Sequence, residues 1–151
     1  MTTDADIVIA GGGLNGPALA LALARAGLGV ALVDPRPARA RGEAGFDGRA
    51  YALAAASRRL LGALGVWDAL APQAQPIRRI KASDGRAGTG AAPFFLQFDS
   101  AEIEEGPMGF MVEDRHLHAA LRDAVEAEPG IATHRAAATA QAVEGGRIAV
   151  G

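Results

Sequence analysis

The stretch Asp6-Ile7-Val8-Ile9-Ala10-Gly11-Gly12-Gly13-Leu14-Asn15-Gly16 decides the fold of this chain. Its first half is a run of β-branched residues, which is typical of a strand buried on both faces of a parallel sheet. Its second half has the spacing G-x-G-x-x-G, with Gly11, Gly13 and Gly16 as the three glycines. The first glycine permits a tight turn, the second lets a diphosphate approach the backbone, and the third allows close packing of helix on strand. The stretch therefore predicts a strand, a glycine turn and a helix that together bind a nucleotide.

A helix and a second strand complete this unit. Residues 18–26 predict the helix, and Gly27 is expected to end it. Val30–Val33 predict a second parallel strand, and Asp34 follows it directly. A carboxylate at this position can accept hydrogen bonds from ribose hydroxyls, and it would repel a 2′-phosphate. Arg36 leaves open the alternative that the site accepts such a phosphate.

Composition and charge narrow the function classes. The chain has 151 residues and a formal net charge of −2, so a basic face for nucleic acid is not expected. It has no cysteine, which excludes disulfides, thiolate nucleophiles and cysteine-based metal sites. The histidines His116, His118 and His134 lack metal spacing, and we interpret them as surface or capping residues. The N-terminus lacks the basic region of a signal peptide, and the apolar stretch over residues 17–33 is too interrupted for a membrane span.

The remaining segments predict a mixture of helices and strands. After a solvated loop over residues 35–48, a helical segment begins at Arg49, carries a leucine stripe and ends at Gly65. Further strands are predicted over residues 77–83, 94–98, 109–113 and 131–134. Asp114 is expected to cap a helix over residues 115–128. Gly145-Gly146 has the composition of a hairpin turn near the end of the chain.

Four stretches of this sequence carry a resemblance to a known family. They are Asp6 to Asp34; Asp47-Gly48-Arg49-Ala50-Tyr51-Ala52-Leu53 with Ser57, Leu60 and Leu64-Gly65-Val66-Trp67; Ile80-Lys81-Ala82-Ser83-Asp84; and Gly109-Phe110-Met111-Val112-Glu113 with Arg115, Leu117 and Leu121. With them the chain resembles the N-terminal part of the flavin-dependent aromatic hydroxylases, the fold group of p-hydroxybenzoate hydroxylase. Within that group it is most similar to the ubiquinone-biosynthesis hydroxylases, of the 2-polyprenyl-6-methoxyphenol hydroxylase type.

The resemblance implies FAD as the cofactor, NAD(P)H as the reductant and a phenol, which can be prenylated, as the substrate. It implies that the ADP half of FAD is held by Gly11, Gly13, Leu14, Asn15, Gly16 and Asp34. Arg49 would reach FAD from the loop after the second strand, and Arg115 would contact the ribityl–phosphate region. Without the family, both arginines would be interpreted as surface ion pairs. No catalytic residue and no metal ligand is expected, because in such enzymes the flavin carries the chemistry.

The expected fold is α/β, with a Rossmann-like FAD-binding βαβ domain, a parallel sheet and the first strands of a β-rich substrate domain. We assign residues 1–71 to the FAD-binding domain, 72–108 to the substrate-domain sheet and 109–151 to a return to the FAD-binding domain. Family members are longer, so the chain is expected to be truncated, to retain FAD weakly and to lack hydroxylation activity alone. The parent protein is expected in the cytoplasm, with peripheral contact at the inner face of the membrane. Two alternatives stay open: an NAD-dependent dehydrogenase and a non-catalytic nucleotide-binding module.

Overall fold

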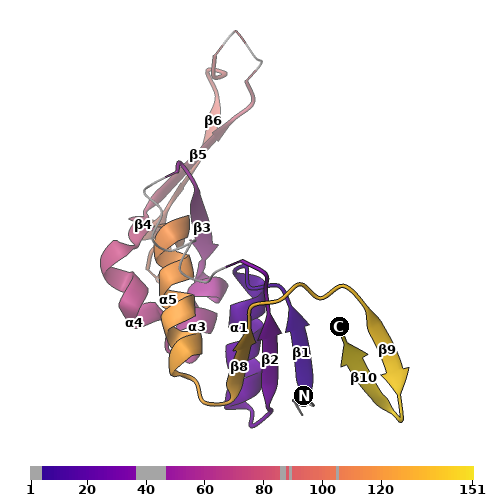
Figure 1. The fold of residues 1–151 in the computed structure, drawn as a ribbon. Helices are drawn as coiled ribbons and strands as arrows, with labels where there is room; N and C mark the ends of the chain where they lie inside the picture. Colours follow the sequence, from indigo (N-terminus) through magenta and orange to yellow (C-terminus); the bar gives the residue numbers. More distant parts are fainter. Residues whose placement is uncertain (1–4, 37–46, 86–87, 89, 105) are drawn as a thin grey trace.

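The computed structural model describes residues 5–36, 47–85, 88, 90–104 and 106–151. The molecule is elongated, with a parallel sheet at one end, helices in the middle and a two-stranded arm at the other end (Figure 1). Most of the predicted solvated loop, residues 37–46, lies outside the described residues. No helix in the described part of the chain is both long and apolar enough to cross a membrane.

The parallel sheet and its first helix confirm the predicted βαβ unit. Strand β1 (Ile7–Ala10) leads through the glycine turn into helix α1 (Asn15–Arg25), which leads into strand β2 (Val30–Val33). Strand β8 (Ile131–His134) returns to pair in parallel with β2, so the strand order is β1-β2-β8. Gly27 ends α1 as predicted, with a φ of 89° that favours glycine.

The central strand of this sheet is the most covered. Val30, Ala31 and Leu32 of β2 are buried and Val33 is partly buried, whereas the side chains of β1 alternate between partial burial and exposure, and Val8 is 41% exposed. The prediction that β1 is buried on both faces is therefore wrong. The physical reason is that β1 is an edge strand of the described sheet and only one of its faces is covered by packing.

An antiparallel sheet forms the middle of the molecule. Strands β3 (Ala50–Ala54) and β4 (Gln75–Ile77) pair on either side of β7 (Gly109–Glu113). The prediction of helix from residue 49 onward is wrong for residues 50–54, which pair along their length with β7. Gly109 permits this close pairing, because a Cβ there would overlap the carbonyl oxygen of Leu53.

The predicted helix is confirmed only from Ala55. Helix α3 (Ala55–Ala63) ends before Gly65, whose φ is 59°, and α4 (Trp67–Leu70) and the short η1 (Ala71–Gln73) follow. Within the expected leucine stripe, Leu61 and Leu64 are buried, but Leu60 is 52% exposed.

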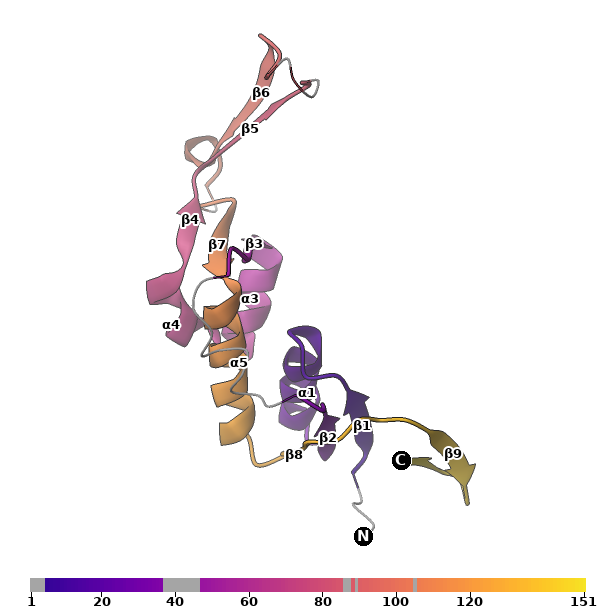
Figure 2. The ribbon, with the colours of Figure 1, turned by 45° about the horizontal axis from the view of Figure 1, so that its top comes forward.

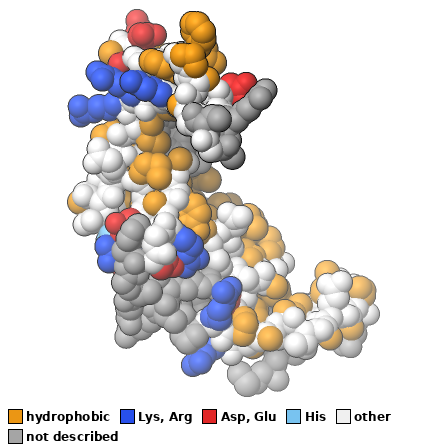
Figure 3. Space-filling view, turned by 90° about the horizontal axis from the view of Figure 1, so that it is seen from above, with side chains coloured by type: hydrophobic (Ala, Val, Ile, Leu, Met, Phe, Trp, Pro, Cys, Tyr) orange, Lys and Arg blue, Asp and Glu red, His pale blue; other side chains and the backbone are white. Residues whose placement is uncertain are grey.

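A two-stranded arm projects from the antiparallel sheet (Figures 1 and 2). It consists of β5 (Arg79–Ser83) and β6 (Phe95–Asp99), followed by the short η2 (Ser100–Glu102). Residues 77–83 were predicted as one strand, but they belong to two strands in different sheets, since β4 pairs with β7 and β5 with β6. Hydrophobic, basic and acidic side chains lie together on the arm, at the top of the space-filling view (Figure 3).

A second hairpin lies near the end of the chain. Strands β9 (Gln141–Glu144) and β10 (Arg147–Val150) pair in antiparallel fashion around a two-residue turn. Gly145 and Gly146 form this turn with φ values of 57° and 80°, which confirms the predicted hairpin.

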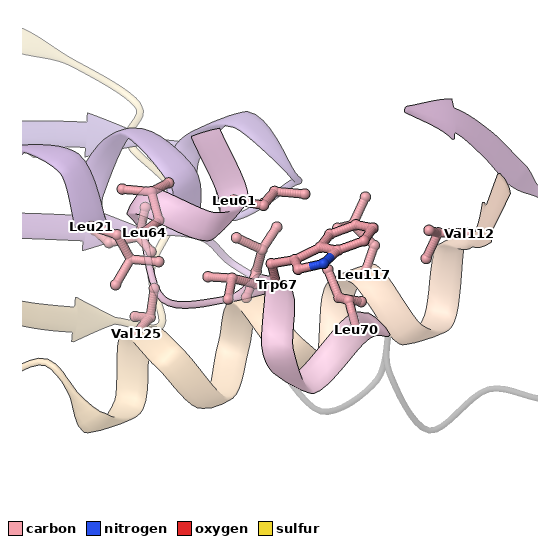
Figure 4. Close-up of a cluster of buried hydrophobic side chains, with 11 residues drawn as sticks. Leu21, Leu61, Leu64, Trp67, Leu70, Val112, Leu117 and Val125 are labelled. Carbon is pink, nitrogen blue, oxygen red and sulfur yellow. The ribbon is translucent and has the colours of Figure 1, made fainter. Parts of the chain in front are cut away.

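One hydrophobic core joins the two sheets through helix α5 (Asp114–Ala127). The predicted stripe of Leu117, Leu121 and Val125 is buried, and it packs with side chains of α1, α3 and α4 (Figure 4). Trp67 meets Phe110 of β7 edge to face, with ring centroids 4.8 Å apart. Helix α5 therefore runs from the antiparallel sheet, through the core, to the strand that returns to the parallel sheet.

Candidate functional site

The glycine turn lies at the carboxyl end of β1 and depends on its glycines for different reasons. Gly11 has a φ of 119°, and its N–H donates to the carbonyl of Val33 at 2.8 Å. A Cβ on Gly16 would overlap the carbonyl oxygen of Gly11, so only glycine fits there. A Cβ on Gly13 would meet no heavy atom within 4 Å, so this residue faces open space that a ligand can occupy.

The start of helix α1 presents backbone N–H groups toward this space. Its N-cap residue is Leu14, and α1 begins at Asn15. No side chain of the described residues caps this end, and no acidic residue lies in its first turn. The first N–H groups of a helix have no acceptor within the helix, and the helix dipole is positive at this end. Such a helix start suits an anionic group such as a diphosphate.

Asp34 faces the glycine turn from the end of β2. Its carboxylate accepts the N–H of Gly12 at 2.6 Å and the N–H of Arg36 at 2.8 Å, and its side chain is only 13% exposed. An ionised carboxylate offers about four acceptor positions, so these two bonds are compatible with additional bonds from ribose hydroxyls. Gly12 was not among the residues predicted for the site, yet a Cβ there would lie 3.0 Å from that of Asp34. Asp34 therefore holds the backbone of the turn at Gly12 through a hydrogen bond, in addition to lying opposite the turn.

A cavity of about 200 Å³ opens beside Asp34, between the ends of β2 and β8 and one face of α5. Its polar lining includes Gly12, Asp34, His118, Arg122, His134 and Arg135. Two buried nitrogens, Arg122 Nη1 and His134 Nε2, have no hydrogen-bond partner among the residues that the structure describes. Sequence reasoning missed Arg122, and the only signal for it was its spacing of four residues from His118 on one helix face.

A second polar cluster lies where β3 meets the start of α5. Arg49 contacts Asp47 at 2.6 Å and Asp114 at 3.3 Å through Nη2. Tyr51 donates its hydroxyl to Asp114 at 2.9 Å, and His118 Nε2 lies 3.4 Å from the same carboxylate oxygen. Asp114 is only 3% exposed, so its charge is buried among these partners.

The pKa shifts within the cluster follow from these contacts. The hydrogen bond from Arg49 lowers the pKa of Asp47, and the same bond raises the pKa of Arg49. The hydrogen bond to Asp114, followed by desolvation, raises the pKa of Tyr51 above its ordinary value. The cluster therefore keeps Arg49 and the Tyr51 hydroxyl protonated.

The two predicted arginines come together through strand pairing. Ala50 pairs with Glu113, which places Arg49 and Arg115 at the same end of the β3–β7 pair. Arg115 Nε contacts Glu113 at 2.6 Å, and its side chain is 35% exposed. Both arginines thus make ion pairs with chain neighbours. Helix α5 links them to the glycine turn, because Asp114 contacts Arg49 and His118 lines the cavity at Asp34.

Two assignments made from the sequence need correction. Asp114 is the first residue of α5 rather than its N-cap, because its carboxylate is buried against Tyr51 and Arg49. His118 is not a surface residue, since its side chain is only 12% exposed and lies against Asp114 and the cavity. Within the described ranges, no group of three metal-ligating side chains comes together.

Comparison with known sequences gives one family and several relatives. The sequence matches the family described as FAD binding domain over residues 4–147. It is 45% identical over 117 residues to the ubiquinone hydroxylase UbiL of Rhodospirillum rubrum, covering 78% of this chain and 26% of the relative. It is 38% identical over 128 residues to the 3-demethoxyubiquinol 3-hydroxylase of Escherichia coli K12, covering 83% of this chain and 31% of the relative. The chain thus spans about a third or less of these relatives.

Solved structures show the same fold at low identity. The p-nitrophenol 4-monooxygenase PnpA of Pseudomonas putida matches with a TM-score of 0.72 and 17% identity, over 99% of this chain and 36% of that one. The flavin-dependent monooxygenase PieE, solved in complex with FAD and substrate, matches with a TM-score of 0.70 and 19% identity, over 97% of this chain and 26% of that one.

Proposed function

The chain belongs to the FAD-binding domain family, and we propose that it holds the ADP half of FAD in a flavin-dependent aromatic monooxygenase. One observation carries this proposal: the Asp34 carboxylate lies across the open glycine turn and accepts the N–H of Gly12 at 2.6 Å. In this proposal a ribose acceptor and a diphosphate cradle would lie side by side, at the carboxyl edge of a parallel sheet, which is where nucleotides bind in such folds.

Each part of the site has a defined role in this proposal. The N–H groups at the start of α1, from Leu14, Asn15 and Gly16, would donate to the diphosphate, and the open space at Gly13 would admit it. Asp34 would accept the ribose hydroxyls, and the neighbouring cavity would take the adenine base. The residues present therefore fit the ADP half of the cofactor.

Arg49 and Arg115 would act on the other half of FAD, near its ribityl–phosphate region. Their shared position at the end of the β3–β7 pair supports a joint role. When bound, FAD supplies the redox chemistry, in which NAD(P)H is the reductant and one oxygen atom of O₂ enters the substrate ring while the other leaves as water. The described residues contribute binding and orientation.

For the whole protein, we propose hydroxylation of a phenol, which can be prenylated, in ubiquinone biosynthesis. The names of the two relatives, a ubiquinone hydroxylase and a 3-demethoxyubiquinol 3-hydroxylase, support this substrate class.

We further propose a cytoplasmic location with peripheral contact at the inner membrane face. A vesicle flotation assay tests this, and a protein that stays with the soluble fraction at every lipid composition would contradict it. The division of the chain at residues 71 and 108 stays a prediction.

Titration with four nucleotides tests the proposed cofactor. We expect the protein to bind FAD and ADP with measurable heat in calorimetry and to bind NAD⁺ more weakly than FAD. The guanidinium of Arg36 is paired with Asp34, with Nε 3.7 Å from Oδ1, so its positive charge is offset, and a 2′-phosphate at Asp34 would meet the negative charge of the carboxylate. ADP carrying a 2′-phosphate is therefore expected to bind more weakly than ADP. Preference for NAD⁺ would favour the dehydrogenase alternative, and no binding of any of these ligands would contradict the proposal.

A further inference from the structure

We propose that Asp114 is a positioning residue of the FAD site, which fixes Arg49 and His118 with one buried carboxylate. This inference rests on the proposed function, because it assumes that Arg49 reaches FAD and that the cavity lined by His118 takes the adenosine part. Asp114 itself would touch neither end of the cofactor. Its effect would pass through the two side chains that it holds.

The burial of Asp114 is the first argument. It is 3% exposed, and it is the one charged side chain that is fully buried among the described residues. A buried carboxylate is costly unless it is paired and hydrogen-bonded, and Asp114 meets this condition through Arg49, Tyr51 and His118. An acidic residue in the first turn of a helix is favourable even when it is exposed to solvent. The formation of α5 therefore does not require the carboxylate of Asp114 to be buried.

The geometry of its partners is the second argument. Oδ2 of Asp114 lies 3.3 Å from Arg49 Nη2, while Oδ1 accepts the Tyr51 hydroxyl at 2.9 Å and lies 3.4 Å from His118 Nε2. The two carboxylate oxygens thus face different parts of the site. Oδ2 is directed at Arg49, which directly precedes β3, and Oδ1 lies between Tyr51 of β3 and His118, which lines the nucleotide cavity.

The exposure of Arg49 is the third argument. Its side chain is 64% exposed, and its other carboxylate partner, Asp47, is itself 44% exposed. Exposed ion pairs fix side chains weakly, because solvent screens them and both partners lose conformational freedom. Of these two carboxylates Asp114 is the buried one, with a side chain that is 5% exposed. It therefore defines where the guanidinium lies before the cofactor arrives.

The test is a set of variants measured by FAD affinity, from the change in flavin fluorescence on titration. Asp114→Asn keeps the size of the side chain and removes its charge, and we expect it to raise the Kd for FAD about tenfold. Arg49→Gln should have an effect of similar size. In the double variant the two effects should combine to less than their product, because part of the effect of Asp114→Asn passes through Arg49.

Two controls separate positioning from general destabilisation. Tyr51→Phe removes a hydrogen bond to the same carboxylate, so it should lower thermal stability but change the Kd for FAD by less than about threefold. Asp99→Asn removes a comparable partner of an arginine, since Asp99 contacts Arg79 at 2.9 Å, but it lies on the arm. It should leave FAD affinity unchanged.

A second measurement keeps the proposal testable if Asp114→Asn fails to fold. Arg49→Gln and His118→Gln leave Asp114 in place, and each should raise the Kd for FAD, because Asp114 is proposed to act through both side chains. Effects of Asp114→Asn and Arg49→Gln that multiply fully, unchanged FAD affinity in both Arg49→Gln and His118→Gln, or an Asp114→Asn protein that folds and binds FAD like the wild type, would overturn the inference alone. A wild-type protein that binds neither FAD nor ADP would instead overturn the proposed function, and with it this inference.

Discussion

Replacing Asp34 by asparagine tests whether the carboxylate at the end of β2 binds ribose. The substitution keeps the shape of the side chain and one oxygen acceptor, but it removes the negative charge. In the protein without ligand, the bond from Gly12 at 2.6 Å changes from a charge-assisted bond to a neutral one. Charged hydrogen bonds contribute about 1.5–3 kcal/mol and neutral ones about 0.5–1.5 kcal/mol, so we expect a stability loss of about 1 kcal/mol.

The loss in binding should be larger than the loss in stability. Two ribose hydroxyls donating to Asp34 would each lose about 1–1.5 kcal/mol when the acceptor becomes neutral. The sum of about 2–3 kcal/mol corresponds to a rise in the Kd for ADP of roughly 30- to 150-fold. Because the Asp34 side chain is only 13% exposed, solvent screening reduces this figure less than it would at the surface.

Asp6→Asn is the matched control for this experiment. The carboxylate of Asp6 accepts the N–H of Gly29 at 2.7 Å, so it joins the same two strands at their opposite ends. The control loses a bond of the same kind, away from the glycine turn, and should bind ADP like the wild type. The assay is calorimetric titration with ADP, together with urea unfolding. A Kd for Asp34→Asn within about threefold of that of Asp6→Asn would refute the ribose role.

Three further predictions follow from the glycine turn, the polar cluster and the core. Gly16→Ala should lower stability by about 1–3 kcal/mol, because the new Cβ overlaps a carbonyl of the turn, as measured by urea unfolding. Gly13→Ala should leave stability unchanged and weaken ADP binding, because its Cβ enters open space; equal effects of the two variants on stability would contradict this. Tyr51→Phe should lower stability by about 1.5–3 kcal/mol at neutral pH, since the hydroxyl donates to a charged, buried acceptor. The raised pKa of Tyr51 means that this difference is fully present below pH 10.0 and shrinks as pH rises further, so a difference that grows in alkali would refute the assignment. Leu121→Ala should cost about 2–5 kcal/mol in urea unfolding; Leu60→Ala, at a site 52% exposed, should stay within about 0.5 kcal/mol of the wild type.

The parts of the fold that obey local rules could be predicted from the sequence. The turn at Gly11, the helix end at Gly27 and the hairpin at Gly145-Gly146 each require backbone conformations that glycine adopts most easily. Their positions therefore follow from residue type and spacing alone. The strand order β1-β2-β8 agrees with the same βαβ logic, because parallel strands need a crossover through a helix.

The strands of the antiparallel sheet depend on partners far away in the chain. Ala50–Ala54 has the composition of a helix, but pairing with β7, about 60 residues later, makes it a strand. The break between β4 and β5 likewise exists because the two segments pair with different strands. Neither pairing leaves a pattern within the segment itself, so a reading of local periodicity could not find it.

The same distinction explains which site residues were found. Asp34 and the glycines belong to a motif within one continuous stretch, so their spacing identified them. Asp114 was assigned to a local capping role, whereas its partner Tyr51 lies 63 residues away in the sequence. His118 faces the cavity only because α5 packs beside β2 and β8. Asp114 and His118 can be recognised as site residues only in the folded structure, where strand pairing brings them close to the other residues of the site.

Helix α5 connects the two parts of the proposed site, because the residues proposed to contact the two halves of FAD lie beside different sheets. The glycine turn and Asp34 follow strands of the parallel sheet, whereas Arg49 directly precedes β3 of the antiparallel one. Their relative placement is set by the core along α5, where Leu117, Leu121 and Val125 are buried. A ligand that spans both sheets would gain affinity from this rigidity, since an already ordered site loses less conformational freedom on binding. The core of the protein and the affinity of its nucleotide site are therefore linked through one helix.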